Sequence, residues 1–427
     1  MKRPIIRATS VVLLMLCLMY FLTYLDRVNV STAAEGFGKE FSLNRTQIGL
    51  VFSAFAYPYL VFQIIGGWVS DRFGAKRTLI VCGGMWAVAT ILTGFSFGLI
   101  SMLAARLLLG LGEGATFPAA TSAMARWVKK QNRGFAQGLT HAFSRIGNAA
   151  APAAIVYIMA AYGWRMAFYI SGALSLVWVL VWALTFTEDP ADHPGVSPEE
   201  LAGLPAVRKK NAQVPWMPLA KRMLPVTIVY FCYGWTLWLF LSWIPQYFLH
   251  SYRLDLKESA LFSSSVFFAG VIGDTLGGII SDKIFKRTGN LKRARSQMVA
   301  VCLLLALLSL LPILFNHDLL ISIISLSAGF FFAEMTIGPM WAIPMDIAPE
   351  FSGTASGMMN TGSALAAIMS PVVSGYVIDR FDNWELPFFG SMVLMAIGVL
   401  LAYRMHPELK FVGETSRGAN HAVPLNP

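Results

Sequence analysis

The segment GGWVSDRFGAKR, residues 66–77, lies at the end of an apolar run and closes on two basic residues. A shorter version of the same pattern, GGIISDK, recurs at residues 277–283. A second pair of matching segments begins at Gly134 and at Gly353, each with the spacing Gly-x-Ala-x-Gly. Local patterns that recur far apart in one chain indicate an internal duplication. The chain is therefore expected to consist of two similar halves.

The composition is typical of a protein that crosses a membrane many times. Of 427 residues, 56% are hydrophobic and 13% charged, and the mean hydropathy is +0.60. A run of about 20 apolar residues can cross a bilayer as a helix. Twelve such runs are expected near residues 10–31, 46–69, 78–97, 99–125, 134–157, 164–186, 222–250, 256–281, 296–315, 318–347, 351–378 and 385–404. We predict an all-α membrane protein with twelve transmembrane helices in two parallel six-helix repeats.

A polar interval divides the twelve runs into six and six. The predicted parts are an N-terminal bundle (1–187), a linker (188–221), a C-terminal bundle (222–405) and a tail (406–427). Basic residues gather in loops on one side of the predicted bundle, for example at 126–133, 208–210 and 283–295. By the positive-inside rule this side is cytoplasmic, with both termini, in the inner (plasma) membrane. The formal charge of +10 then reflects topology, and no nucleic-acid partner is expected beside the lipid bilayer.

Two adjacent charges, Asp26 and Arg27, interrupt the first apolar run. A charge at mid-membrane costs about 2.5–3.5 kcal/mol on insertion scales, so an intramembrane pair indicates a functional site. Arg27 recurs with Tyr20 and Tyr24 at helical spacing, which places these residues on one polar stripe facing a cavity. Asp26 points about 100° away, toward a neighbouring helix.

The fourth run carries a second pair, Arg106 and Glu113, seven residues apart with Gly110 between them. This spacing is two helical turns, so a guanidinium and a carboxylate share one wall of the cavity. Arginine keeps its charge and grips carboxylates through two hydrogen bonds. A partly desolvated carboxylate is suited to carrying a proton. The pattern predicts a site where an anion and a proton compete.

The segment at 66–77 resembles the signature of the major facilitator superfamily, Gly-x-x-x-Asp-Arg-x-Gly-x-basic-basic. The matching residues are Gly67, Asp71, Arg72, Gly74, Lys76 and Arg77. Gly67 is expected to let two helices approach closely. Asp71 and the basic residues are expected to form an ion-pair latch that breaks when the halves rock. The alternative is a solvated turn that only obeys the positive-inside rule.

Within that superfamily, YLDRVN (24–29) and RLLLGLGEGATFP (106–118) resemble the anion:cation symporter branch. That branch includes proton-driven carriers of galactonate, hexuronates, glucarate, tartrate and phthalate, and the lysosomal sialic acid exporter. The resemblance implies that Asp26 and Glu113 are the proton-coupling carboxylates and that Arg27 holds the substrate carboxylate. It further implies that Arg106 interacts with the glutamate, and it places Tyr24, Tyr59 and Asn360 in the substrate site.

Other polar residues of the predicted helices have open roles. Gln63 lies one turn beyond Tyr59, and Ser356 shares a face with Asn360, but small polar residues also join helices to one another. The second-tier site candidates are His141, Arg145, Trp235 and Glu334. Arg145 is either a second anchor for a dicarboxylate or structural, and Glu334 either binds a proton or substrate hydroxyl or is structural. Asp274 is expected to pair with loop cations.

These patterns predict proton-coupled symport of a small organic anion into the cell by alternating access. A sugar acid such as an aldonate, hexuronate or aldarate is the expected substrate. Two alternatives stay open: a proton antiporter that exports an amphipathic compound, and a carrier of an aromatic carboxylate or tartrate. No nucleophile–base pair, nucleotide-binding loop or Cys/His cluster is found in the sequence, so we expect no enzyme activity, no cofactor and no metal. A monomer is the expected state.

Overall fold

The computed structural model describes residues 7–43, 45–205, 213–254 and 256–411. The predicted basic cluster at 208–210 and most of the predicted tail lie outside these ranges. The regular structure within them is helical, as predicted. The main helices are α1 (Ala8–Thr32), α2 (Ala34–Glu40), α3 (Arg45–Ala54), α4 (Ala56–Phe73), α5 (Ala75–Gly94), α6 (Leu99–Gly114), α7 (Thr116–Trp127), α8 (Arg133–Tyr162), α9 (Trp164–Thr185), α10 (Pro198–Leu201), α11 (Trp216–Ser251), α12 (Leu256–Thr288), α13 (Met298–Leu310), α14 (Leu319–Glu334), α15 (Ile337–Ile347), α16 (Ser352–Phe381) and α17 (Leu386–Ala402).

Each predicted apolar run corresponds to one of these helices or to two in succession. Ten described segments are long and apolar enough to span a membrane, and α17 is a shorter apolar helix. Several helices extend past the predicted ends: α11 begins at Trp216 rather than near 222, and α12 continues to Thr288. The added turns contain charged residues, which an apolar criterion misses but a helix that continues beyond the bilayer accommodates.

Two of the spanning segments are broken in their middle. α6 and α7 are separated at Ala115, and α14 and α15 are separated at Met335 and Thr336. Pro118 and Pro339 follow these breaks within one turn, and neither can donate the backbone hydrogen bond that would continue the helix across the break. The breaks occupy corresponding places in the two predicted repeats.

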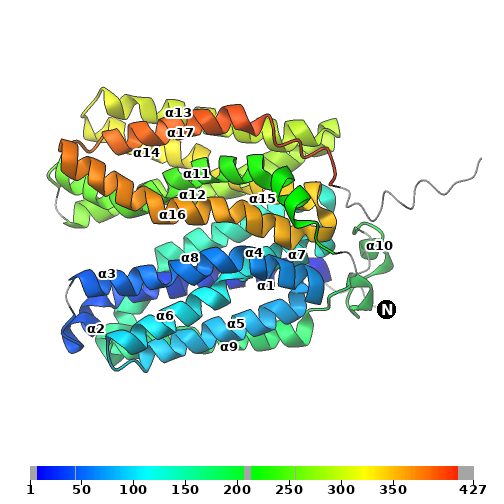
Figure 1. Ribbon diagram of the computed structural model, residues 1–427, viewed down its shortest axis with the longest axis horizontal. Helices are drawn as coiled ribbons and strands as arrows, with labels where there is room; N and C mark the ends of the chain where they lie inside the picture. Colours follow the sequence, from blue (N-terminus) through cyan, green and yellow to red (C-terminus); the bar gives the residue numbers. More distant parts are fainter. Residues whose placement is uncertain (1–6, 44, 206–212, 255, 412–427) are drawn as a thin grey trace, which may run out of the picture.

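The helices form two groups that lie side by side (Figure 1). One group contains α1 to α9 and the other α11 to α17, with α10 of the linker at the end where the N-terminus lies. Matching pairs of helices pack within each group: α1 with α8 and α11 with α16, then α5 with α9 and α13 with α17. Between the groups, α4 packs on α16 and α12 packs on α8. This pattern agrees with the predicted duplication.

The two groups touch almost backbone to backbone at the end near the linker. A Cβ atom added to Gly67 of α4 would lie 2.2 Å from the carbonyl oxygen of Gly353 at the start of α16. A Cβ added to Gly278 of α12 would lie 2.3 Å from the carbonyl oxygen of Gly134 at the start of α8. The predicted close approach at Gly67 is therefore present, and the duplicated segment provides a second one.

Two aspartates hold these contacts by capping helix N-termini of the opposite group. Asp71 accepts hydrogen bonds from the backbone N–H groups of Gly353 (2.9 Å) and Thr354 (2.6 Å) in α16. Asp282 accepts from Gly134 (3.1 Å) and Phe135 (2.7 Å) in α8. A carboxylate is favoured there because the first N–H groups of a helix lack internal partners and carry partial positive charge.

The prediction that Asp71 forms an ion-pair latch with the basic residues is therefore wrong about the partner of Asp71. Asp71 binds a helix N-terminus, whereas Arg72 lies over the rings of Trp68 and Phe73. Lys76 contributes its backbone N–H to Glu188 of the linker (3.0 Å). A loop sequence cannot show that the nearest counter-charge is the end of a helix nearly 300 residues later.

Gly67→Ala is expected to separate the two groups at the linker end, because its methyl group would overlap the Gly353 carbonyl. The distance can be measured by double electron–electron resonance between spin labels on cysteines placed at Phe73 and Glu350, in a background without the native cysteines. Its mean should be longer in Gly67→Ala than in the protein with Gly67. Gly84→Ala is the matched control, since nothing lies within 4 Å of its added Cβ. An unchanged distance in Gly67→Ala would contradict the proposed role of this contact.

Candidate functional site

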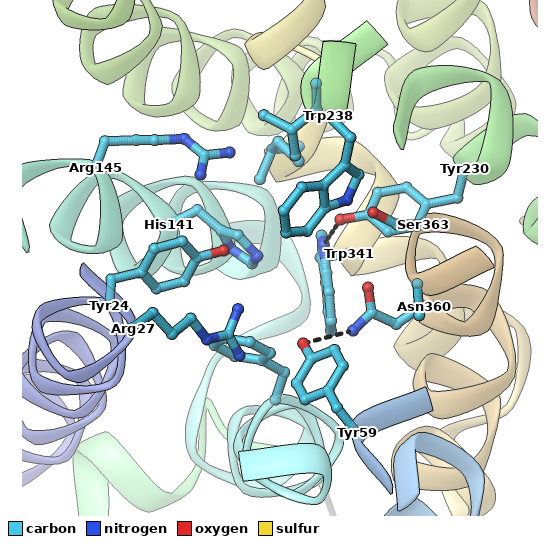
Figure 2. Close-up of a pocket in the computed structure, with 14 residues that line it drawn as sticks. Tyr24, Arg27, Tyr59, His141, Arg145, Tyr230, Trp238, Trp341, Asn360 and Ser363 are labelled. Carbon is cyan, nitrogen blue, oxygen red and sulfur yellow. Dashed lines mark hydrogen bonds between the residues drawn. The ribbon is translucent and has the colours of Figure 1, made fainter. Parts of the chain in front are cut away.

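A pocket lies between the two groups of helices, deeper than the linker-end contact (Figure 2). Both groups contribute to its wall, α1, α4, α7 and α8 from one and α11, α15 and α16 from the other. The wall is aromatic and polar, with two arginines. The lining residues are Tyr24, Arg27, Tyr59, Phe117, His141, Arg145, Tyr230, Leu237, Trp238, Ile337, Trp341, Asn360, Ser363 and Ala364.

Arg27 reaches the pocket from α1, as its predicted stripe requires. Its Nε lies 2.6 Å from Oε2 of Glu113, which is fully buried in α6. The guanidinium carbon also lies 4.8 Å from the ring centroids of both Tyr24 and Tyr59. An arginine enclosed by rings keeps its planar face satisfied without water, which leaves its N–H edge for anions. Arg27 Nη2 has no hydrogen-bond partner within the described residues.

The expected interaction of Arg106 with Glu113 is absent from the ion pairs of the described residues. Arg106 instead donates from Nε to the carbonyl of Val51 (3.3 Å) and lies over the ring of Phe55. The seven-residue spacing did place both side chains on one face of α6. Arg27 pairs with the carboxylate instead, because its side chain reaches from α1 to Glu113, a tertiary contact that helix spacing cannot predict. Arg106 does not line the pocket.

Asp26 faces away from the pocket and into the packing of α1 against α5 and α9, as predicted. Its Oδ2 accepts hydrogen bonds from Nε1 of Trp86 (2.8 Å), Oγ of Ser175 (3.2 Å) and Oγ1 of Thr90 (3.3 Å). The side chain is 2% exposed, and Oδ1 has no partner among the described residues. Three neutral donors stabilise one oxygen, while the other has room for a proton.

A second charged cluster joins the two groups of helices. Arg145 of α8 donates from Nη2 to Oε2 of Glu334 in α14 (2.9 Å), and its Nε lies 3.7 Å from Oδ2 of Asp274 in α12. Tyr233 donates its hydroxyl to the other oxygen of Glu334 (2.9 Å). The prediction that Asp274 pairs with loop cations is therefore wrong. The sequence showed three isolated charges, and the packing of α12 on both α8 and α14 brings them together.

A polar bridge crosses the pocket between α4 and α16. Asn360 donates to Oε1 of Gln63 (2.9 Å) and lies 3.5 Å from the hydroxyl of Tyr59. Tyr59 and Asn360 line the pocket, whereas Gln63 only supports them. Ser356 bonds to the carbonyl of Gly353 within its own helix (3.0 Å), and it does not line the pocket.

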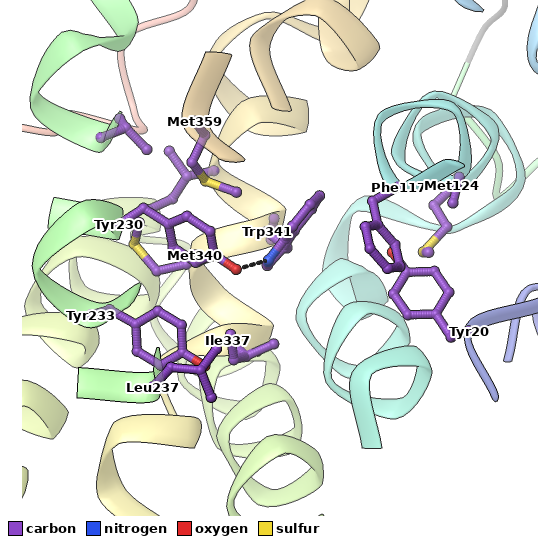
Figure 3. Close-up of a cluster of buried hydrophobic side chains, with 14 of the residues drawn as sticks. Tyr20, Phe117, Met124, Tyr230, Tyr233, Leu237, Ile337, Met340, Trp341 and Met359 are labelled. Carbon is purple, nitrogen blue, oxygen red and sulfur yellow. Dashed lines mark hydrogen bonds between the residues drawn. The ribbon is translucent and has the colours of Figure 1, made fainter. Parts of the chain in front are cut away.

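The aromatic wall of the second group was only partly predicted. Trp235 packs on Phe231 outside the pocket, and Trp238, one turn later, lines it instead. Trp341 was not predicted: it donates from Nε1 to the hydroxyl of Tyr230 (2.7 Å) and projects toward Phe117 of the first group (Figure 3). Its signal in the sequence was its place between Pro339 and Pro344 in a broken helix. His141 completes this side, with its ring 5.0 Å from that of Trp341.

The fold agrees with comparisons to known proteins. The family model of the Major Facilitator Superfamily matches residues 16–371. Known structures with the same fold include the superfamily transporter FucP in the outward conformation (16% identity, TM-score 0.73, 93% of this chain and 99% of that one). The proton:xylose symporter XylE gives a TM-score of 0.74 at 14% identity, over 93% of this chain and 95% of that one.

The chain belongs to the Major Facilitator Superfamily. It is 45% identical to the probable sulfoacetate transporter of Cupriavidus necator, over 98% of this chain and 99% of the relative. It is 28% identical to a probable galactarate/D-glucarate transporter of Escherichia coli, over 95% and 94%. It is 27% identical to a hexuronate transporter of Bacillus subtilis, over 91% and 93%. These relatives are transporters rather than enzymes, and the chain is a multi-pass protein of the inner membrane.

Glu113→Ala is expected to lower the thermal stability of the purified protein strongly, because it leaves Arg27 without its counter-charge. Breaking a buried ion pair costs about 3 kcal/mol or more. Glu40→Ala is the matched control, since its pair with Arg165 is 45% and 34% exposed at the two side chains and such pairs contribute about 1 kcal/mol or less. Equal shifts of the melting temperature in detergent would show that the Arg27–Glu113 pair contributes little.

Proposed function

We propose that this protein is a proton-coupled carrier of a small organic anion. The observation that carries the proposal is the position of Arg27: its guanidinium lines the pocket between the two groups, with Nε paired to Glu113 and Nη2 without a hydrogen-bond partner among the described residues. An arginine so placed attracts carboxylates and sulfonates, which accept two parallel hydrogen bonds from it. A carrier of cations or of apolar compounds has no use for this group.

A short-chain sulfonate–carboxylate such as sulfoacetate is the proposed substrate class. The 45% identity to the probable sulfoacetate transporter extends over nearly the whole of both chains, far above the identity to the sugar-acid carriers. The pocket itself supports a compact ligand, because bulky rings occupy much of its wall, including Phe117, Trp238 and Trp341. This replaces the sugar acid as the first candidate.

Glu113 is proposed to couple anion binding to protons. Its carboxylate already neutralises the charge of the Arg27 guanidinium, so carboxylate and substrate anion compete for one positive charge. A proton on Glu113 removes this competition and frees Arg27. Loss of the proton on the side with higher pH restores the pair and expels the anion. Asp26, buried behind Arg27 with one oxygen unpartnered, is the proposed second proton carrier.

The direct test is uptake of radiolabelled sulfoacetate, glucarate and a hexuronate into proteoliposomes under an inward proton gradient. We expect accumulation of sulfoacetate by the wild type and none by Arg27→Ala. Glu113→Gln mimics the protonated carboxyl, so it should still exchange internal for external substrate but not accumulate it. Gradient-driven accumulation by Glu113→Gln would contradict the coupling role, and absence of uptake of every acid by the wild type would overturn the carrier function proposed here.

A sugar acid is the second candidate, and the polar bridge from Asn360 to Tyr59 and Gln63 favours it. Amide and hydroxyl groups in a pocket wall suit the hydroxyls of an aldarate or hexuronate, which sulfoacetate lacks. Removing a partner of a buried hydroxyl costs about 1–3 kcal/mol.

Asn360→Ala should therefore raise the KM for glucarate about tenfold or more if a sugar acid is the substrate, because a 1.4 kcal/mol loss is a tenfold change. The KM for sulfoacetate should change less, since it has no hydroxyl for Asn360 to bind. Ser356→Ala is the control, because that hydroxyl bonds within its own helix. Glucarate transport that Asn360→Ala leaves unaltered would remove the support for the second candidate.

A further inference from the structure

The cluster of Arg145, Asp274 and Glu334 is unused by the proposed coupling through Arg27 and Glu113. All three side chains are buried, at 4%, 0% and 0% exposure. A buried charge is expensive unless it is paired, and a cluster of this kind at the level of a binding pocket calls for a functional account. Of the three, only Arg145 lines the pocket.

The hydrogen bonds of Arg145 leave part of its guanidinium available. Nη2 donates to Glu334 and lies 3.5 Å from the Tyr233 hydroxyl, while Nε lies 3.7 Å from Asp274. Nη1 is buried and has no hydrogen-bond partner within the described part of the chain. In Figure 2 the guanidinium points from α8 toward the space beside His141 and Tyr24. The carboxylates therefore hold one part of a side chain that lines the pocket, and they leave Nη1 unused.

Arg145 and Arg27 share the ring of Tyr24. The guanidinium carbon of Arg27 lies 4.8 Å from its centroid and that of Arg145 lies 5.8 Å from it. The two carbons are therefore at most about 11 Å apart, the sum of these distances. A dianion with one methylene group between its two acid groups, as in sulfoacetate, with one hydrogen bond of about 2.8 Å at each end, can join two guanidiniums within this limit.

We propose that Arg145 is a second anion site, which binds the distal acid group of a dianion whose first acid group is held by Arg27. This inference rests on the proposed carrier function and narrows its substrate class to compounds with two acid groups. Asp274 and Glu334 hold Arg145 in place and balance its charge while the pocket is empty. Because they belong to the second group of helices and Arg145 to the first, a ligand that engages Arg145 acts on a contact between the two groups.

Binding to the purified full-length protein tests this with an isosteric pair: sulfoacetate, a dianion, and sulfoacetamide, which keeps the sulfonate but has a neutral amide. The wild type should bind sulfoacetate at least tenfold more tightly, measured by competition with labelled sulfoacetate. Arg145→Gln should reduce this ratio to within about threefold by weakening sulfoacetate alone. Arg145→Lys should keep part of the preference. Arg165→Gln, at an exposed ion pair, should keep all of it.

Glu334→Gln gives a second test that leaves Arg145 in place, for the case in which Arg145→Gln does not fold. Removing one negative charge beside the guanidinium should tighten sulfoacetate binding several-fold and leave sulfoacetamide unchanged. Equal weakening of both compounds would show a purely structural role. A wild type without preference, or an Arg145→Gln variant that retains the preference, also overturns the second site.

A failure of the second site can be distinguished from a failure of the proposed carrier function. Only a wild type that binds neither compound nor any sugar acid would refute the carrier function. If the ligand proves to be glucarate rather than sulfoacetate, gluconate is its singly charged partner, and the same ratios apply.

Discussion

The ion pair of Arg27 and Glu113 determines how the first group of helices is assembled. Glu113 is fully buried in a bundle that faces lipid, so a cation must reach it from another helix. The side chain of Arg27 reaches it from α1. The glycines of α6 let the start of α4 come close as well: a Cβ added to Gly110 would lie 2.3 Å from the Phe55 carbonyl. The rings that surround Arg27 then follow from the same approach. The ion pair at the pocket and the close helix packing around it therefore depend on each other.

The charges divide unequally between the two groups. The pocket's two arginines, Arg27 and Arg145, both belong to the first group, and the second group faces them with aromatic rings and the carboxylates of Asp274 and Glu334. An anion in the pocket is therefore held mainly from one side. Arg145 is also joined to the second group by its ion pairs with Asp274 and Glu334 beside the pocket. On the proposal made above, the first group binds the anion and the second responds to it through these pairs.

Much of this arrangement could be predicted from the sequence, because helix periodicity fixes directions within a helix. The orientation of Arg27 into the pocket and of Asp26 into the helix packing both follow from their position on one helix. The partners could not be predicted, because they depend on how helices cross. Glu113 pairs with Arg27 rather than with Arg106, and Asp274 lies beside Arg145 rather than beside loop cations. The helical character of the apolar runs was predicted well, and the ends of the helices less well, because charged turns extend beyond the apolar runs.

The contacts at the linker end bear on the free energy needed to separate the two groups of helices there. The glycines of α4 and α12 meet backbone rather than interlocking side chains, and the buried Arg133–Asp346 ion pair is a further contact between the groups at this end. Asp71 and Asp282 bind N–H groups that water can satisfy equally well once the groups part, so the net cost of each lost bond is about 0.5–1.5 kcal/mol. Ligands and protons shift such equilibria only by their differential affinity for the two states. On the proposal made above, hydrogen bonds from a dianion to Arg27 and Arg145 would each contribute free energy of the same order as one of these lost bonds.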